Sequence, residues 1–573
     1  MTATADGRVR RVSGPLVEAS GLPDAAMFDV VELGTDRLPG EIVALGGDRA
    51  TIQAYEYTGG LAPGDVATAR GEPLVAALGP HLLGGVFDGL LRPLSGAGQW
   101  LTPTSRIGTA AGEWHFEPLA EAGVPVEPGT ALGRITGLSI DHLVVVPPGI
   151  RGPLSAIACE GSYPAETPVA TVAGTEVRLV SRWPVRHPRP YRERLDEVVP
   201  LVTGQRVVDL LLPVPAGGTA AVPGGFGTGK TVLLQQIAKW CEADVIVYVG
   251  CGERGNEMAE IVAEFAELSD PRTGGRLADR TVVIANTSNM PMMAREASIY
   301  TAVTVAEYFR DMGLETVVIA DSTSRWAEAL REFASRSGAL PAEEGYPAEL
   351  ASALAGFYER AGRVRTLGGA TGSVTIIGAV SPPGGDMTEP VTTHTQRFIR
   401  CLWSLDRDLA YARHYPAVSW RESFARDTAA VARWHARHGD QGWADRRAVV
   451  GGILADADRL GELAELVGLT GLPGRERVTI LGGRLVREGL LQQSALSLVD
   501  SFSSLARTAA LADAVLAVVS TCQRLVDQGV PVTRIEEHDF SPLLRAREEL
   551  GSGDTDQIPR RRDAVLASLE ELA

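Results

Sequence analysis

The sequence predicts a multidomain α/β protein with a small N-terminal β-barrel, a parallel-sheet domain carrying a β-rich insert, and a C-terminal helical domain. Three patterns lead to this prediction. Short alternating segments broken by turn residues fill the first 70 residues. Apolar runs alternate with helical stretches between residues 187 and 425, and apolar residues recur at helical spacing beyond residue 425. The 573 residues are enough for three or four domains of about 150 residues each.

The composition excludes several classes of function. The 54 basic and 71 acidic side chains give a net charge of −17, which argues against a nonspecific binder of the nucleic-acid backbone, because such binding needs clustered Lys and Arg. The five cysteines are widely spaced and form no CxxC pair, as expected of reduced thiols. The N-terminus has no signal-peptide pattern, and no run of about 18 apolar residues is evident, so we expect any membrane role to depend on partners.

Two regions are predicted to be rich in β-strands. Residues 1–70 are expected to form the barrel from alternating segments such as Arg8–Val12 and Thr51–Gln53. Residues 107–186 are rich in Pro and Gly around the apolar run Leu143–Val146, which predicts a separate β-rich insert. From the residues alone, a structural module without chemistry is as good an interpretation of this insert as a functional one.

The central domain, residues 71–106 and 187–425, is predicted to contain a parallel sheet. Its apolar runs have the Val and Ile content of strands that are buried on both faces. They are Thr219–Val222, Asp244–Val249, Thr281–Ala285, Thr316–Ala320 and Val374–Gly378. Residues 426–573 are predicted to be helical, because apolar residues such as Ile453, Ala457 and Leu460 repeat at helical spacing.

A phosphate-binding loop is predicted where the first of these strands meets a helix. The match to G-x-x-x-x-G-K-T comprises Gly224, Gly225, Phe226, Gly227, Thr228, Gly229, Lys230 and Thr231. The glycines let backbone N–H groups surround phosphates, and the helix N-terminus adds partial positive charge. Lys230 is expected to contact the β- and γ-phosphate oxygens of a nucleotide, and Thr231 is expected to ligate Mg²⁺.

Two further strand ends carry charged candidates. Asp321 follows the strand Thr316–Ala320, where it can reach the Mg²⁺ shell; a cap or turn role is the alternative for a lone Asp. The strand ending at Val249 leads into a Gly-flanked loop with Glu253 and Arg254. We expect Glu253 to orient and deprotonate water, and Arg254 to neutralise transition-state charge or hold the glutamate. A surface ion pair is the alternative.

Together with their neighbours, these residues resemble the catalytic A subunits of the V-type and A-type rotary ATPases over nearly the whole chain. The matching segments are Ser13–Val17, Trp183–Arg186, Leu201–Arg206, Gly252–Glu257, Asp321–Glu328, Glu344–Pro347 and Ser381–Asp386. The β-rich insert is similar to the extra domain that separates these subunits from F-type β chains. The resemblance implies a RecA-like P-loop domain, with ATP or ADP and Mg²⁺ as its ligands.

The resemblance also implies partners and a location. It implies a ring in which the chain alternates with a noncatalytic B-type subunit, and an arginine finger that this neighbour supplies. Central shaft and peripheral stalk subunits would connect the ring to a membrane rotor that moves H⁺ or Na⁺, coupled to ATP hydrolysis or synthesis. The expected location is cytoplasmic, on the inner face of the cell membrane, and no nucleic-acid partner is expected.

Three more site residues come from the resemblance alone. Arg325 matches an arginine that the family keeps near the phosphates. Tyr415, within His414-Tyr415-Pro416, matches an aromatic residue of the adenine pocket, and Leu496 stands where a second aromatic is usual. An aliphatic side chain keeps the apolar burial but loses ring stacking of about 0.5–1.5 kcal/mol, so we expect weaker adenine discrimination.

Three other interpretations stay open on this information. A protein-export ATPase from a related ring would carry the same loop and Asp321, but the insert argues against it. A Rho-like nucleic-acid motor would need a basic, aromatic-rich platform, which is not evident in this sequence. A noncatalytic nucleotide-binding ring subunit is disfavoured by the combination of Lys230, Thr231 and Glu253.

Overall fold

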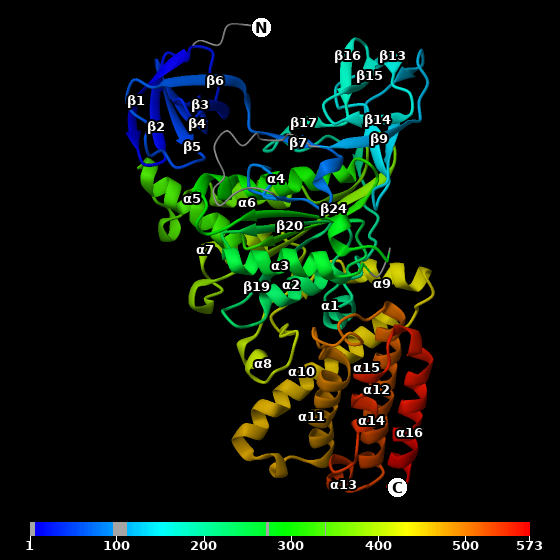
Figure 1. Cartoon of the computed structure of the whole chain (residues 1–573). Helices are drawn as coiled ribbons and strands as arrows, with labels where there is room; N and C mark the ends of the chain where they lie inside the picture. The colour runs from blue at the N-terminus through cyan, green and yellow to red at the C-terminus, as the bar shows by residue number, and fades with distance from the viewer. Residues whose placement is uncertain (1–5, 96–111, 271–273, 339) are drawn as a thin grey trace. The chain divides into compact units, whose positions relative to one another are not determined.

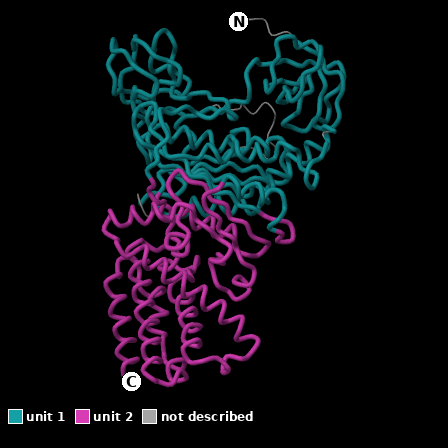
Figure 2. Tube along the Cα trace, turned by 180° about the vertical axis from the view of Figure 1, so that it is seen from behind, with its two compact units in different colours: residues 1–197, 243–380, 387–398 teal, residues 198–242, 381–386, 399–573 magenta. Residues whose placement is uncertain are grey.

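The computed structural model describes residues 6–95, 112–270, 274–338 and 340–573. The chain forms two compact units, which Figure 2 shows in different colours. Unit 1 comprises residues 1–197, 243–380 and 387–398, and unit 2 comprises residues 198–242, 381–386 and 399–573. Each unit therefore combines segments that are far apart in the sequence.

Six antiparallel strands close into a barrel at the start of unit 1, as predicted (Figure 1). They are β1 (Asp6–Ser13), β2 (Leu16–Ser20), β3 (Asp29–Leu33), β4 (Leu38–Gly46), β5 (Arg49–Ala54) and β6 (Val66–Pro73), in the order β1-β2-β5-β4-β3-β6. Side chains such as Val17, Val31, Ile42 and Ile52 are fully buried in the barrel core. Because β1 pairs with β6, every strand of the barrel has two partners.

The insert is β-rich, as predicted, and consists of two four-stranded antiparallel sheets. The strands are β9 (Glu113–Pro118), β10 (Pro125–Val126), β11 (Ala131–Thr136), β12 (His142–Val145), β13 (Gly152–Ile157), β14 (Gly161–Pro164), β15 (Pro168–Val172) and β16 (Thr175–Arg178). One sheet has the order β10-β13-β15-β16 and the other the order β12-β11-β9-β14. Phe116, Leu132 and Leu154 are fully buried in a common apolar core. The predicted start of the insert, residue 107, lies outside the described residues.

Unit 1 also contains five parallel strands in the order β24-β22-β20-β21-β8. They are β8 (Val86–Phe87), β20 (Val245–Cys251), β21 (Thr281–Asn286), β22 (Glu315–Asp321) and β24 (Thr371–Val380). The helices of this part are α3 (Gly255–Glu267), α4 (Met292–Arg310), α5 (Thr323–Ser337), α6 (Leu350–Tyr358) and α7 (Pro390–Phe398). Every residue of β20 and β21 is buried, which explains their continuous apolar sequence. The register pairs Gly250 with Asp321, so the carboxyl ends of β20 and β22 lie at one edge of the sheet.

Unit 2 holds the strand that precedes the predicted phosphate-binding loop. This strand, β19 (Thr219–Pro223), pairs in parallel with β25 (Cys401–Leu402), which pairs antiparallel with β26 (Phe424–Ala425). Helices α1 (Arg206–Leu211), α2 (Lys230–Trp240) and α8 (Arg407–Tyr411) belong to the same unit. All five residues of β19 are buried, so the start of the loop is anchored in the protein interior.

The rest of unit 2 is helical, as predicted for the C-terminal domain (Figure 1). It comprises α9 (Thr428–Arg437), α10 (Trp443–Val467), α11 (Gly474–Val486), a π-helical turn (Arg487–Leu491), α12 (Leu505–Asp527), α13 (Val532–Glu536), α14 (Ser541–Leu544), α15 (Ala546–Glu549) and α16 (Ile558–Glu570). Helix α12 is long and apolar enough to cross a membrane by length and composition alone, yet half of its apolar stretch is buried within the protein. Leu511, Val515 and Val518 are fully buried, so α12 is a core helix of this domain.

Arg186 joins the barrel to helix α4 through two buried carboxylates. Its guanidinium donates to Glu41 of β4 at 3.0 and 3.2 Å and to Glu296 of α4 at 2.7 and 3.0 Å. Glu41 is 1% exposed and Glu296 is 5% exposed. Burial raises the pKa of Glu41, and the charge of Arg186 opposes that shift. Arg186 is therefore the counter-charge that keeps this pair of carboxylates stable inside the protein.

Arg186→Met should lower the free energy of unfolding of unit 1 by about 3–5 kcal/mol, because it leaves two buried carboxylates without a counter-charge. The matched control is Arg182→Met, which removes a 3.0 Å pair with Glu72 between exposed side chains and should cost at most about 1 kcal/mol. Urea unfolding of the full chain measures both losses. Equal losses for the two variants would contradict the role of Arg186.

Candidate functional site

The phosphate-binding loop predicted from the sequence connects β19 to α2 in unit 2. Gly227 (φ +80°) and Gly229 (φ +83°) adopt left-handed conformations, which explains why the loop needs glycine at both positions. The Thr228 hydroxyl donates to Gly225 O at 2.9 Å and fixes the turn between them. The loop ends at the start of α2, where the first N–H groups have no partner within the helix. Such a helix start favours an anion.

Lys230 is the first residue of α2, and its side chain folds back over the loop. Its Nζ donates to Gly224 O at 3.2 Å and to the Ser381 hydroxyl. Thr231 follows at the second helical position and is half-buried. No role was predicted for Ser381; the signal for it is its place in the matching segment Ser381–Asp386, directly after the observed end of β24 at Val380. These two acceptors hold the ammonium group beside the loop, where phosphate oxygens are expected.

A cavity of about 480 Å³ beside the start of α2 brings the two predicted base-pocket residues together. Tyr415 and Leu496 both line it, with Gly229 of the loop and Val232 of α2. The Tyr415 ring is so close to Gly229 that a Cβ atom there would lie 3.3 Å from the ring. Tyr415 is 40% exposed, whereas Leu496 is 97% exposed. Leu496 therefore offers apolar surface that the rest of the unit does not cover.

Asp321 ends strand β22 in unit 1 and is 2% exposed. Tyr248 of the neighbouring strand β20 donates its hydroxyl to Asp321 Oδ2 at 3.2 Å. Burial raises the pKa of Tyr248 well above its usual range, and the charge of Asp321 adds to the shift, so Tyr248 stays a proton donor. Sequence reasoning missed Tyr248 because its apolar neighbours are those of an ordinary core residue. Tyr248 lies close to Asp321 because β20 and β22 are adjacent parallel strands.

Glu253 lies just beyond the carboxyl end of β20, in a loop held by main-chain hydrogen bonds. Gly252 N donates to Asn286 O at 2.7 Å, and Ser288 N donates to Glu253 O at 2.9 Å. Gly252 has a φ of +75°, and a Cβ atom there would lie 2.8 Å from Arg325 Cβ. Glycine therefore permits the close approach of α5 to this loop. The loop and the end of β22 share one edge of the sheet.

The two predicted arginines make ion pairs of their own. Arg325, on α5, donates Nη1 to both carboxylate oxygens of Glu328 at 3.0 Å. Hydrogen bonding to Glu328 raises the pKa of Arg325, and the charge of Glu253 adds to the shift, so Arg325 is within electrostatic reach of Glu253. Arg254 is exposed and forms an ion pair with Glu257 at 3.4 Å.

The predicted site residues divide between the two units. The loop Gly224–Thr231, Tyr415 and Leu496 belong to unit 2, whereas Glu253, Arg254, Asp321 and Arg325 belong to unit 1. Within unit 2 the candidate phosphate and base contacts meet at Gly229. Within unit 1 the acidic candidates follow two adjacent parallel strands.

Comparisons with known proteins assign a family to most of the chain. The matching family models are the ATP synthase alpha/beta family beta-barrel domain (residues 9–71), the ATP synthase alpha/beta subunit barrel-sandwich domain (109–186), the ATP synthase alpha/beta family nucleotide-binding domain (204–425) and the C-terminal domain of V and A type ATP synthase (432–534). Full-length relatives agree. The V-type ATP synthase alpha chain of Nitrosococcus oceani is 50% identical over 543 residues, or 92% of each chain.

Two more relatives match almost end to end. The V-type ATP synthase alpha chain of Anaeromyxobacter sp. (strain K) is 50% identical over 99% of this chain and 98% of its own length. The corresponding chain of the A-type ATP synthase of Metallosphaera sedula is 45% identical over 99% of both chains. The chain belongs to the V-type and A-type ATP synthase family. As the catalytic subunit of this ATP synthase family, it is an enzyme that binds ATP or ADP and works in a rotary complex that transports ions.

This family assignment confirms the resemblance that the sequence motifs carried. A headpiece of the V/A-type ATP synthase family is part of a complex that is peripheral to a membrane. A solved structure, the assembled ATPase EscN from the type III secretion system of enteropathogenic E. coli, aligns with a TM-score of 0.63 at 22% identity, over 90% of this chain and 100% of that chain. That likeness concerns the fold alone. At 50% identity, the ATP synthase relatives support the family's activity better than the export alternative.

The histidine next to Tyr415 makes the stability of unit 2 depend on pH. His414 is 8% exposed and meets the Trp420 ring edge-on, with ring centroids 6.1 Å apart. Burial lowers the pKa of His414 to about 4. In the unfolded chain a histidine titrates near pH 6.5, so between the two values only the unfolded state binds the proton. The folded state therefore loses stability as the pH falls from about 6.5 to about 4.

His414→Gln should flatten this acid-side slope by up to about 1.4 kcal/mol per pH unit, because it removes the titrating ring. The measurement is the free energy of unfolding between pH 7 and pH 4.5. The exposed His438→Gln variant is the matched control and should keep the slope of the unmodified chain. If His414→Gln kept the same slope, the buried histidine would not be responsible.

Proposed function

We propose that ATP binds with its phosphates at the loop Gly224–Thr231 and its base in the cavity lined by Tyr415 and Leu496. The observation that supports this most directly is the meeting of three features in unit 2. Helix α2 starts at Lys230, directly after Gly229, and the Lys230 ammonium lies beside the loop. Gly229 also lines the cavity of about 480 Å³. A nucleotide needs such a combination, because its anionic and aromatic ends are joined by one ribose.

The charged residues have distinct proposed roles in the transfer of the γ-phosphoryl group. Lys230 neutralises the β- and γ-phosphate oxygens. Glu253 orients the attacking water and accepts its proton on the carboxylate, and it returns the proton when the reaction runs toward synthesis. Arg254 and Arg325 offset the negative charge that develops on the transferred group.

Thr231 and Asp321 are the proposed ligands of Mg²⁺. A hydroxyl and a carboxylate are hard oxygen donors, which is the donor type that Mg²⁺ takes in proteins. The Tyr248 hydroxyl on Asp321 Oδ2 orients the carboxylate at the end of β22. When bound, Mg²⁺ supplies charge neutralisation for the phosphate oxygens. The residues present therefore fit the ion.

The proposed assembly follows from the family. The chain alternates with a noncatalytic B-type subunit in a ring, and that neighbour supplies an arginine to the transition state. Central shaft and peripheral stalk subunits connect the ring to a membrane rotor that moves H⁺ or Na⁺, on the cytoplasmic, inner face of the cell membrane. No nucleic acid takes part. The proposed functional division of the chain is 1–70, 71–106 with 187–425, 107–186, and 426–573.

Glu253→Gln should lower the rate of ATP hydrolysis by about 10²- to 10⁴-fold and leave nucleotide affinity unchanged, because an amide cannot accept the proton of water. Turnover is measured in the assembled ring, and MgATP affinity is measured by calorimetry on the full chain. Glu260→Gln, at an exposed position of α3, is the matched control and should behave like the unmodified chain. Unchanged turnover of the Glu253 variant would move the base to another residue.

The purified chain should hydrolyse MgATP slowly by itself and about 10³- to 10⁵-fold faster in a ring with the B-type subunit from the same genome, because the arginine comes from the neighbour. A ring built with Lys230→Arg should stay inactive, since a planar guanidinium does not replace a compact ammonium in the loop. Full activity of the chain alone would contradict a shared site and would favour the self-sufficient export or nucleic-acid motor.

A further inference from the structure

The wall of the base cavity is formed by a segment that has no regular secondary structure. Residues Gln492–Ser503 lie between the π-helical turn Arg487–Leu491 and helix α12 in unit 2. Five consecutive residues at its start, Gln492–Leu496, line the cavity. Because neither a helix nor a sheet ladder fixes this segment, its position depends on loop hydrogen bonds and on side-chain contacts.

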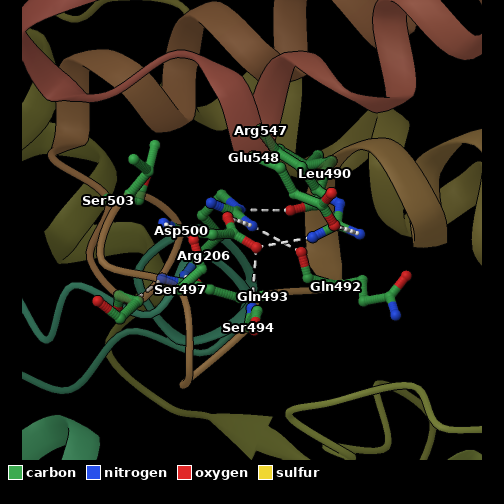
Figure 3. Close-up of polar contacts among 12 residues, drawn as sticks. Arg206, Leu490, Gln492, Gln493, Ser494, Ser497, Asp500, Ser503, Arg547 and Glu548 are labelled. Atoms are coloured by element: carbon green, nitrogen blue, oxygen red, sulfur yellow. Dashed lines mark hydrogen bonds and ion pairs between the residues drawn. The ribbon is translucent and has the colours of Figure 1, made fainter.

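Asp500 is the centre of the contacts that hold the segment (Figure 3). The residue is fully buried, with 0% exposure. Its Oδ1 accepts a hydrogen bond from Arg206 Nη2 at 2.7 Å. Its Oδ2 accepts one from Ser494 N at 2.8 Å and another from Arg547 Nη1 at 2.7 Å. One carboxylate thus links the cavity wall to α1 and to α15.

Arg206 connects α1 to Leu490, just before this segment, and to Gln492, its first residue. It is the first residue of α1 and is fully buried. Its Nε donates to Leu490 O and its Nη2 to Gln492 O, both at 2.6 Å. Burial lowers the pKa of Arg206 to about 10, and the Asp500 carboxylate opposes that shift. The guanidinium is therefore charged at neutral pH and needs the carboxylate beside it.

Arg547 makes the corresponding connection from α15. Its Nε donates to Glu488 O at 2.8 Å, and both Arg547 and Glu548 line the cavity. Arg507 of α12 approaches Asp500 Oδ1 to 4.0 Å and donates to Phe502 O at 2.7 Å. Three guanidinium groups therefore surround the Asp500 carboxylate, and removing its charge leaves them to repel one another.

Gln493 connects Arg206 to Tyr415, which lines the opposite side of the cavity. Its N–H donates to Tyr415 O at 2.7 Å, and its side-chain oxygen accepts from Arg206 N at 2.9 Å. Its Nε2 donates to Gly204 O at 2.8 Å. The position of Tyr415 relative to the segment is thus set by a residue that Arg206 holds, and Arg206 is held by Asp500.

The geometry points to Asp500 as a positioning residue for the nucleotide base: by fixing Gln492–Leu496 against Tyr415, it sets the affinity for the base and not for the phosphates. This inference rests on the proposed base site. Asp500 itself is fully buried and contacts the cavity wall through Ser494 N rather than lining the cavity. It therefore acts through other residues. Its loss should raise KM with little change in kcat.

The test compares a ligand that has a base with one that lacks it, using the full chain. MgATP reports on the whole site, and inorganic tripolyphosphate reports on the phosphate-binding loop alone. Asp500→Asn should weaken MgATP binding by up to about 10-fold, because it loosens the packing of the base against Tyr415. Tripolyphosphate binding should be unchanged. The exposed Asp527→Asn, at the end of helix α12, should change neither.

A second variant covers the case in which Asp500→Asn does not fold. Asp500→Asn/Arg507→Met removes one carboxylate and one guanidinium, neither of which lines the cavity, so it keeps the net charge of the cluster while still releasing the segment. It should show the same selective loss of MgATP binding. In the assembled ring with the B-type subunit, the same variant should raise KM for MgATP and keep kcat.

Each possible result either supports or contradicts the positioning role of Asp500. Equal weakening of MgATP and tripolyphosphate, or no change in either, would overturn the positioning role. A different result would count against the base site itself: if the unmodified chain bound MgATP no more tightly than tripolyphosphate, the cavity would not be the base site. The two failures are therefore distinguishable.

Discussion

The start of helix α2 is the feature on which the candidate site depends. The fully buried strand β19 fixes where the loop begins, and the left-handed Gly229 turns the chain directly into the helix. The helix N-terminus and the ammonium of Lys230 then concentrate positive charge in a chain whose net charge is −17. The proposed base cavity adjoins the same glycine, so in the proposed site one backbone junction locates both ends of a nucleotide.

The features that the sequence predicted correctly are those governed by short-range rules. Strands such as β20 are continuous apolar runs because both faces of a parallel sheet are covered. The phosphate-binding loop has a fixed spacing of glycines, because particular positions need left-handed conformations. The barrel and the C-terminal helices follow from the two periodicities of strand and helix.

The contacts that the sequence did not predict join residues far apart in the chain. Tyr248 has the apolar neighbours of a core residue, and its contact with Asp321 spans 73 positions and depends on strand register. Asp500 lies in a serine-rich stretch typical of an exposed loop. It is buried because Arg206, 294 positions away, supplies the opposite charge. No local pattern contains that information.

Arginine fills the buried cationic roles in this chain, and the structure shows why. Arg206 donates to two main-chain carbonyls and a carboxylate in different directions, which needs the planar fork of a guanidinium. The three donors of a lysine sit on one nitrogen, so they cannot span acceptors that lie as far apart as those of Arg206 Nε and Nη2. Lys230 is in the opposite situation, because the phosphate-binding loop calls for a compact point charge.

Leu496 has a practical consequence for following nucleotide exchange. Its side chain is almost wholly exposed, and an aliphatic group sets no ring-to-ring distance for a bound base. In the proposed base site, a base enlarged on the Leu496 side therefore meets no rigid partner, whereas its opposite side still meets Tyr415. Fluorescent nucleotides with extended bases therefore suit the proposed site as optical reporters of nucleotide exchange.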